Sequence, residues 1–310
     1  MMNKISEQIE KNYNITVSSL SVLQDGSDNL VLKVDTSSED CFVLRISKKE
    51  KTVDDVLFET SLCEFLSSND LPVAKIIRTK NNSLNCLVDG KNAVLFSFCS
   101  GEKVNISPSE KTSVKLAYNG GKCLAILHKK LMRFYECETN YGSRTQEQEL
   151  LRVVKNKSQF REKFINADDF IVQVEDILRK VSGYGKDTIL HNDFRIQNVL
   201  FDQEDVSAIL DFDWACPGNK LKDLAHALVE WSFPDGAKSY WPDIFDNFLF
   251  GYESVSGKID RKELKDWILF SCLSDTATYL MDRIESQDER KEIRSYMYKK
   301  YLFFMNEYIE

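Results

Sequence analysis

The chain has 310 residues, of which 43% are hydrophobic, with 8 cysteines and a formal net charge of −8. This composition is typical of one large or two modest globular domains, and it includes neither the basic stripe of a nucleic-acid-binding surface nor an apolar run near the length of a membrane span. The N-terminus lacks the apolar segment of a signal peptide and the cysteines are scattered, so we expect a cytoplasmic protein with free thiols and with no nucleic-acid or membrane partner.

The first hundred residues predict a β-sheet with one internal helix. After a short amphipathic helix at 4–13, apolar and β-branched runs predict strands at 16–23, 30–34, 41–46, 74–79, 85–88 and 93–99. The internal helix is expected at 54–68, because apolar residues there follow helical spacing behind acidic residues and Pro72 blocks its continuation. The turn that contains Gly26 and Ser27 would offer backbone N–H groups to phosphates, and its alternative is a plain hairpin turn.

The chain beyond Ser100 predicts a mainly helical part. A polar stretch marks the change of composition, and helical spacing then predicts helices at 114–131, 146–157, 167–181, 221–231, 245–252, 261–279 and 288–309. The first of these carries Gly120, Gly121 and Ala125, small residues that permit another helix to pack closely against it. The sequence therefore predicts an α+β protein whose composition changes near residue 100.

The stretch at 189–214 holds the most informative pattern. Two apolar runs flank a polar turn at 202–205, which predicts a β-hairpin. The hairpin would bring Asn198, before its first strand, close to Asp211, after its second strand, with Asp193 nearby. Magnesium prefers oxygen ligands and takes only one or two carboxylates where phosphates supply the rest. The pattern therefore predicts a phosphoryl-transfer site.

The same residues resemble a known family. The motif that carries the resemblance is His191-Asn192-Asp193, then Asn198, Asp211, Gly218 and Asp223-Leu224-Ala225. It is similar to that of the aminoglycoside phosphotransferases and homoserine-kinase-like enzymes, which are small-molecule kinases with the protein-kinase-like fold. The stretches at 71–74, 95–101 and 121–128 resemble the turn after their small-lobe helix, their interlobe hinge and the helix before their catalytic loop.

The resemblance implies a bilobal fold. Residues 1–100 would form a nucleotide-binding lobe built on an antiparallel sheet with one helix, with a hinge at about 95–101. Residues 101–310 would form a mainly α-helical catalytic and substrate-binding lobe.

The resemblance also assigns roles to the residues of the motif. Asp193 would be the catalytic base that accepts the proton of the acceptor hydroxyl, and Asn198 and Asp211 would hold Mg²⁺ against the phosphates of ATP, with GTP as the alternative nucleotide. Asp223 would fix backbone N–H groups of the catalytic loop. Asn192 departs from the pattern, because a small residue, often glycine, is common there.

The small lobe departs from the pattern at Arg45, where many relatives have the phosphate-binding lysine. A guanidinium stays cationic, but its planar fork is not equivalent to an ammonium group. Glu59 is the expected partner of Arg45, and Glu64 is the alternative. The hinge around Phe96 and Phe98 would supply backbone hydrogen bonds to the nucleobase, with the aromatic rings beside it.

The acceptor substrate is expected to contact the helical part. The candidate contacts are Asp213, Glu230, Trp231 and Asp275. Acidic side chains mixed with aromatic ones would suit a cationic or amino-bearing hydroxyl compound. For the aromatic residue the alternative is packing in the core, and for Asp213 it is capping of local backbone groups. His128 and His226 are expected to be structural.

The sequence therefore predicts an ATP- and Mg²⁺-dependent phosphotransferase of the aminoglycoside-phosphotransferase type, acting on a hydroxyl of a small molecule. The alternative is a metabolic kinase for homoserine, choline or a similar amino alcohol. The complete set of Asp193, Asn198 and Asp211 disfavours a non-catalytic nucleotide-binding regulatory module. The short stretch between Asp211 and Asp223 disfavours a protein kinase.

Overall fold

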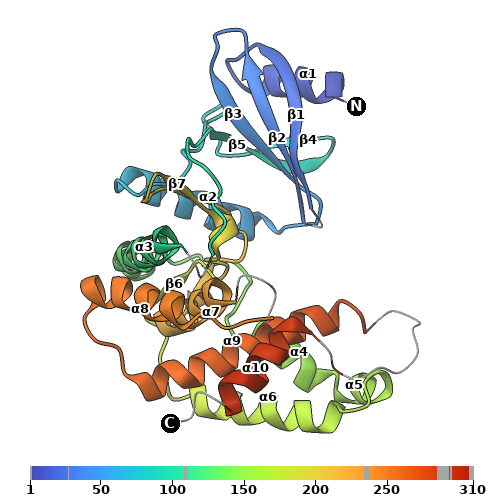
Figure 1. The fold of residues 1–310 in the computed structure, drawn as a ribbon. Helices are drawn as coiled ribbons and strands as arrows, with labels where there is room; N and C mark the ends of the chain where they lie inside the picture. The colour runs from blue at the N-terminus through green and yellow to red at the C-terminus, as the bar shows by residue number, and fades with distance from the viewer. Residues whose placement is uncertain are drawn as a thin grey trace. The chain divides into compact units, whose positions relative to one another are not determined.

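The computed structural model describes residues 2–26, 28–107, 110–233, 238–284, 293 and 295–306. The chain forms two compact units (Figure 1). Unit 1 comprises Met1–Glu102, Thr139–Ser143 and Ser207–Leu210, and unit 2 comprises Lys103–Glu138, Arg144–Val206 and Asp211–Glu310. The first unit is built on a sheet and the second is mainly helical, so the expected α+β fold class is confirmed.

Unit 1 contains a five-stranded antiparallel sheet with the strand order β1-β2-β3-β5-β4. Its strands are β1 (Val17–Asp25), β2 (Asn29–Thr36), β3 (Cys41–Ser47), β4 (Cys86–Val88) and β5 (Lys91–Ser97). Helix α1 (Met2–Asn12) covers one face, where its buried Ile5 and Ile9 join Leu32, Leu44 and other strand residues in one core. Alternate residues of β2 are buried, as the twofold period of a strand requires.

Helix α2 (Val53–Ser68) begins at a capping box. The Thr52 hydroxyl accepts a hydrogen bond from the Asp55 N–H at 3.1 Å, and the Asp55 carboxylate accepts one from the Thr52 N–H at 3.3 Å. The helix buries Glu59 together with Phe58 and Leu62. A carboxylate is therefore held inside unit 1, where it needs a cationic partner.

Two short segments from later in the chain also belong to unit 1. The N–H of Ser143 donates to Asp55 Oδ1 at 2.7 Å, which fastens the first segment to the start of α2. The N–H of Ile209 donates to the Pro72 carbonyl at 2.6 Å, which fastens the second segment just after α2. The sheet unit is therefore not one uninterrupted stretch of sequence.

The predicted strand at 74–79 is wrong. The segment forms only an isolated bridge from Ile76 to Phe96 and single hydrogen bonds, such as Ile77 N–H to the Leu95 carbonyl at 2.8 Å. Strand β4 occupies the same edge of β5 further along, pairing with residues 91–93. The edge is thus divided between two short segments, and neither segment extends along all of it.

Unit 2 is mainly helical. Its helices are α3 (Lys111–Cys137), α4 (Gln148–Lys155), α5 (Lys157–Lys163), α6 (Ala167–Val181), α7 (Lys220–Ser232), α8 (Pro242–Ser256), α9 (Arg261–Met281) and α10 (Tyr296–Asn306). Helix α9 contacts α4, α6, α7 and α10 and is central to the unit (Figure 1). None of the helices in the described part of the chain is long and apolar enough to cross a bilayer.

The remaining elements flank the catalytic stretch. They are β6 (Thr188–Leu190), the 3-10 turn η1 (Ile196–Asn198), β7 (Val199–Asp202), β8 (Asp205–Ile209) and β9 (Cys216–Gly218). Strands β6 and β9 pair antiparallel, and β7 and β8 form a two-stranded sheet, so the predicted hairpin is confirmed. The helix predicted at 146–157 corresponds to α4, and α5, which follows Asn156, extends beyond the predicted range. The helix predicted at 288–309 begins among residues outside the described part, and its described portion is α10.

Helices α3 and α8 approach each other at backbone distance. A Cβ on Gly121 would lie 1.9 Å from the Phe248 carbonyl oxygen, and a Cβ on Gly251 would lie 1.9 Å from the Tyr118 carbonyl oxygen. No side chain fits at either position. The close packing expected from the small residues of α3 is therefore confirmed, and it supports the helix that carries His128.

Candidate active site

Asp223, in the first turn of α7, holds the backbone of the loop that follows β6. Its carboxylate accepts hydrogen bonds from the N–H of His191 at 2.7 Å and from the N–H of Asn192 at 2.8 Å. It also lies 3.1 Å from Nε2 of His128 on α3. These contacts confirm the expected role of Asp223 and the structural role of His128. The loop that presents Asp193 is thereby fixed at two consecutive peptide groups.

The charge of Asp223 is part of this arrangement. The side chain is fully buried, and burial by itself would raise the pKa of the carboxyl. The hydrogen bond with His128 and the one from the backbone N–H of His191, with the electrostatic effect of both residues, outweigh burial and hold the pKa of Asp223 well below its usual range. Asp223 is therefore ionised at neutral pH.

The departure at Asn192 has a conformational explanation. Its φ is 66°, in the left-handed region where glycine is favoured and asparagine is tolerated better than most residues. Its Nδ2 donates to the Trp214 carbonyl at 3.1 Å, and its Oδ1 accepts from Lys222 Nζ. Asparagine thus adopts the glycine-like conformation and adds two contacts that glycine cannot make.

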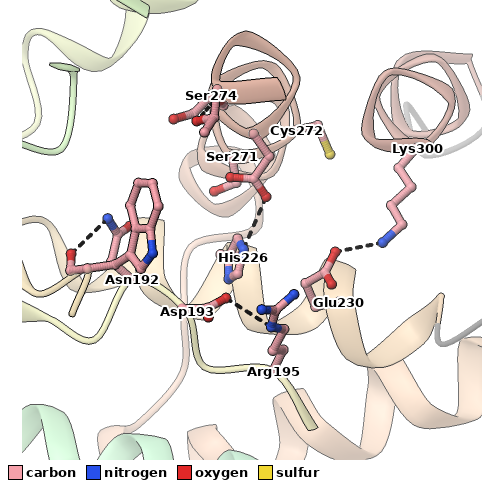
Figure 2. A network of polar contacts seen from close by, with 12 residues as sticks. Asn192, Asp193, Arg195, His226, Glu230, Ser271, Cys272, Ser274 and Lys300 are labelled. Atoms are coloured by element: carbon pink, nitrogen blue, oxygen red, sulfur yellow. Dashed lines mark hydrogen bonds and ion pairs between the residues drawn. The ribbon is translucent and has the colours of Figure 1, made fainter. Parts of the chain in front are cut away.

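Asp193 is held from both sides by short polar contacts. Asn198 Nδ2 donates to the Asp193 carboxylate at 2.7 Å and to its carbonyl at 3.0 Å, and Arg195 Nε lies 3.2 Å from Asp193 Oδ1 (Figure 2). Burial raises the pKa of Asp193, against the opposing charges of Arg195, His226 and His191. A raised pKa brings a carboxylate closer to the range in which it accepts a proton efficiently.

The metal-ligand candidates fit a divalent cation that keeps phosphate ligands. The nitrogen of the Asn198 amide is used by Asp193, which leaves the amide oxygen as the available ligand. Asp211 is exposed, has a left-handed φ of 67°, and its charge acts on Asp193. The described residues contain no group of three or more His, Cys, Asp or Glu side chains arranged for a metal. One amide and one carboxylate match Mg²⁺ that is bound largely through a substrate.

In unit 1, Glu59 lies between two cations. One carboxylate oxygen accepts from the Arg45 guanidinium, and the other accepts from Lys51 Nζ at 2.6 Å. Glu64, the alternative partner, pairs with Arg78 at the surface instead. The structure therefore selects Glu59. The contact to Lys51 was not predicted, because Lys51 lies among other lysines at 48–51 and nothing local distinguishes it.

Two backbone N–H groups of the expected hinge have partners in unit 1. The N–H of Ser97 donates to the Lys75 carbonyl at 2.8 Å, and that of Phe98 donates to the Cys41 carbonyl at 3.3 Å. Both N–H groups are engaged within unit 1, and hydrogen bonds from the hinge to a nucleobase stay a prediction. Phe96 is half-buried with the Arg45 guanidinium 5.3 Å from its ring centre, and Phe98 is 45% exposed.

The backbone N–H and carbonyl of Gly26 both have partners. The Gly26 N–H donates to the Asn29 carbonyl at 3.0 Å, and the Gly26 carbonyl accepts from Lys48 Nζ. The Gly26 N–H is therefore engaged within the turn, as in the plain-turn alternative. Ser27, the other phosphate-binding candidate, lies outside the described residues.

The acceptor candidates fall into different environments. Trp231 is 0% exposed, its Nε1 donates to the Phe194 carbonyl at 3.1 Å, and its ring packs against Gly120, so the structure places it in the core. Glu230 pairs with Lys300 Nζ at 2.7 Å. The other two candidates are Asp275, which lies 3.1 Å from His226 Nε2, and the half-buried Asp213.

The fold is that of kinase-type structures. Amicoumacin kinase hAmiN, solved with AMP-PNP, Ca²⁺ and amicoumacin, superposes with a TM-score of 0.72 at 15% identity, over 98% of this chain and 93% of that one. A microcompartment-associated aminopropanol kinase superposes with a TM-score of 0.70 at 16% identity, over 98% and 96% of the two chains. At these identities the similarity shows the protein-kinase-like fold alone.

Residues 19–260 match the phosphotransferase enzyme family (APH), and the chain belongs to this family. Among curated proteins, it is similar to the homoserine kinase of Zymomonas mobilis subsp. mobilis, with 24% identity over 213 residues. That match spans 67% of this chain and 62% of the relative, so the chain matches less than two thirds of the relative's length.

Proposed function

We propose that this protein is an ATP- and Mg²⁺-dependent phosphotransferase that phosphorylates a hydroxyl group of a small molecule. The observation that carries the proposal is the Asn198 amide, whose nitrogen orients Asp193 at 2.7 Å while its oxygen remains for a metal ion. One side chain thus couples the base to the metal site. Family membership supports the same conclusion, as do structures of similar fold that were solved with AMP-PNP and Ca²⁺ or with ADP.

The residues divide the reaction among them. Asp193 accepts the proton of the acceptor hydroxyl as its oxygen bonds to the γ-phosphorus and the bond to the ADP oxygen breaks. Asn198 and Asp211 would hold Mg²⁺, which when bound neutralises charge on the phosphates. Arg45, kept in place by Glu59, would contact the phosphates of the nucleotide.

The acceptor is proposed to be a small polar alcohol. The names of related proteins point to homoserine and amino alcohols as well as antibiotics. Of the three acidic candidates, Glu230 and Asp275 already have partners in Lys300 and His226. A strongly cationic acceptor therefore finds no uncompensated charge in these two side chains, and this observation favours the metabolic alternative over a polycationic aminoglycoside.

The test is ATP consumption by the full chain against homoserine, 3-amino-1-propanol, choline, aminoglycosides and sugars. Asp193→Asn keeps the shape of the side chain and should lower turnover about 10²- to 10⁴-fold, because it removes the base. The matched control is Asp169→Asn on the exposed side of α6, which should leave turnover unchanged. Turnover by Asp193→Asn within twofold of wild type would refute the base assignment.

A further inference from the structure

His226 on α7 has a buried ring nitrogen that no described residue satisfies. The residue is 4% exposed, and its Nε2 lies 3.1 Å from Asp275 Oδ2 on α9. An ionised carboxylate can only accept, so Nε2 carries the proton. Nδ1 has no hydrogen-bond partner within the part of the chain that the structure describes. Buried polar atoms are almost always bonded, so this nitrogen marks the place of an external polar group.

This nitrogen belongs to the polar cluster around Asp193. The charge of His226 acts on Asp193, and Figure 2 shows the imidazole between Ser271 of α9 and the pair formed by Asp193 and Arg195. A ligand group that bonds to Nδ1 would therefore lie beside the carboxylate assigned to the acceptor hydroxyl. Such a group would make a second contact to the small molecule whose hydroxyl reaches Asp193.

The charges of the cluster favour an anionic ligand. Each of its carboxylates has a basic partner: the pairs are Asp193 with Arg195 at 3.2 Å, Glu230 with Lys300 at 2.7 Å, and Asp275 with His226. Lys222, by contrast, bonds to the neutral amide oxygen of Asn192. The carboxylates of Asp193, Glu230 and Asp275 are thus matched by Arg195, Lys300 and Lys222, while the nearby Asp223 is engaged by the backbone N–H groups of His191 and Asn192, so a proton on His226 adds a positive charge beside Asp193.

The direction in which the pKa of His226 shifts agrees with a protonated ring. Burial lowers the pKa of His226, but the charge and hydrogen bond of Asp275 raise it above its ordinary value. The other charged groups that act on the ring are Lys222, which lowers the pKa, and Glu230, which raises it. Asp193 also lies within electrostatic range. In the protonated ring, Nδ1 becomes a hydrogen-bond donor.

We propose that His226 is a specificity-determining residue that binds a carboxylate group of the acceptor. The inference rests on the proposed kinase function and names its substrate class: hydroxy carboxylic acids, including hydroxy amino acids. The His226 Nδ1–H donates to the carboxylate, the guanidinium of Arg195 adds positive charge, and the hydroxyl of the same molecule reaches Asp193. Asp275 is the positioning residue that fixes the orientation of the ring.

The first experiment compares three acceptors that differ by one group each. Homoserine carries an amine and a carboxylate, 3-amino-1-propanol lacks the carboxylate, and 4-hydroxybutyrate lacks the amine. Wild-type kcat/KM for homoserine should exceed that for 3-amino-1-propanol by about ten- to a hundred-fold, the range for a hydrogen bond to a charged group. Equal values for the two would overturn the inference and leave the kinase function standing.

The second experiment separates the two ring nitrogens. His226→Gln keeps a donor toward Asp275 and removes the group at Nδ1, whereas His226→Asn keeps a neutral donor near Nδ1. With binding through Nδ1, the Gln variant should melt like wild type yet raise KM for homoserine at least about tenfold, while KM for ATP changes less than twofold. If His226 were purely structural, the Gln variant would instead keep both the melting temperature and the KM for homoserine of wild type.

The pH profile provides a readout independent of folding. In wild type, KM for homoserine should rise as pH rises through the pKa of His226, because the imidazolium loses its proton. The same profile for 3-amino-1-propanol should lack this rise. Identical profiles for the two acceptors would overturn the inference even where both variants fail to fold.

Failure of the inference can be distinguished from failure of the proposed function. Calorimetric titration of the full wild-type chain with 4-hydroxybutyrate or homoserine measures binding without phosphoryl transfer. Binding that disappears in His226→Gln, without turnover of any acceptor, would support the carboxylate site and refute the kinase. No binding of either compound to wild type would overturn the carboxylate site.

Discussion

Replacement of Asp223 by asparagine should destabilise unit 2 by about 3 kcal/mol. The carboxylate accepts from two backbone N–H groups at 2.7 and 2.8 Å, and it is fully buried. An amide keeps one acceptor oxygen and turns an NH₂ group toward the other N–H. One buried donor is then unsatisfied, at about 1–3 kcal/mol, and the remaining bond loses roughly 1 kcal/mol of charge assistance. The sum lies near the cost of breaking a buried charged pair, about 3–5 kcal/mol.

The assay is urea unfolding followed by tryptophan fluorescence. All 4 tryptophans (214, 231, 241 and 267) lie in unit 2, so the signal reports on the unit that contains Asp223. The matched control is Asp187→Asn, whose carboxylate also accepts from a backbone N–H, that of Lys220 at 2.9 Å, but is 32% exposed. The control should lose no more than about 1 kcal/mol. A loss below 1 kcal/mol in Asp223→Asn would refute the proposed loop anchor.

The difference in stability between wild type and Asp223→Asn should depend on pH in one direction. The pKa of Asp223 is lower in the folded state than in the unfolded chain, where it is about 3.9. Its contribution to stability is therefore fully present above that value and is lost as pH falls toward the folded pKa. The stability difference between wild type and Asp223→Asn should be constant from pH 7 to 5. Below about pH 4 it should shrink by roughly 1.4 kcal/mol per pH unit.

Two further predictions concern the helix crossing and the small unit. Gly121→Ala should lower the free energy of unfolding by about 3 kcal/mol in urea, because the new Cβ would lie 1.9 Å from the Phe248 carbonyl oxygen. The control Gly183→Ala, whose Cβ would meet nothing within 4 Å, should be nearly neutral. Equal stabilities of the two variants would contradict the close crossing of α3 and α8. Glu59→Gln should raise KM for ATP about tenfold, because it releases Arg45. The surface change Glu64→Gln should leave KM for ATP unchanged. A larger rise of KM in Glu64→Gln than in Glu59→Gln would reject Glu59 as the partner of Arg45.

Much of the fold could be predicted from local patterns. Helix α2 has its capping box and helical spacing within a few residues, and the hairpin of β7 and β8 has its turn residues between two apolar runs. The segment at 74–79 failed because its strand-like composition says nothing about how much of a sheet edge is free. Helix α5 was not predicted because the short stretch at 157–163 carries one apolar residue, Phe160, and so has no helical apolar spacing.

The candidate site shows the same division between local and distant information. The resemblance of the motif from His191 to Asp223 assigns the base, the metal ligands and the loop anchor within one catalytic stretch, and the structure shows the contacts of the loop anchor Asp223. The contacts of Glu59 with Lys51 and of Glu230 with Lys300 were not accessible to such reasoning. Lys300 lies 70 positions from Glu230 and meets it only because α10 is packed near α7.

The sequence by itself determined the α+β class, the phosphotransferase family and the order of Asp193, Asn198 and Asp211, since periodicity and motif spacing are local properties of the chain. Only the tertiary structure decided that Trp231 packs in the core and that Glu230 is neutralised. It also decided that His226 presents a buried, unsatisfied nitrogen beside Asp193. The physical reason is that burial and charge pairing depend on which distant helices meet, and the packing of α7, α9 and α10 sets those contacts.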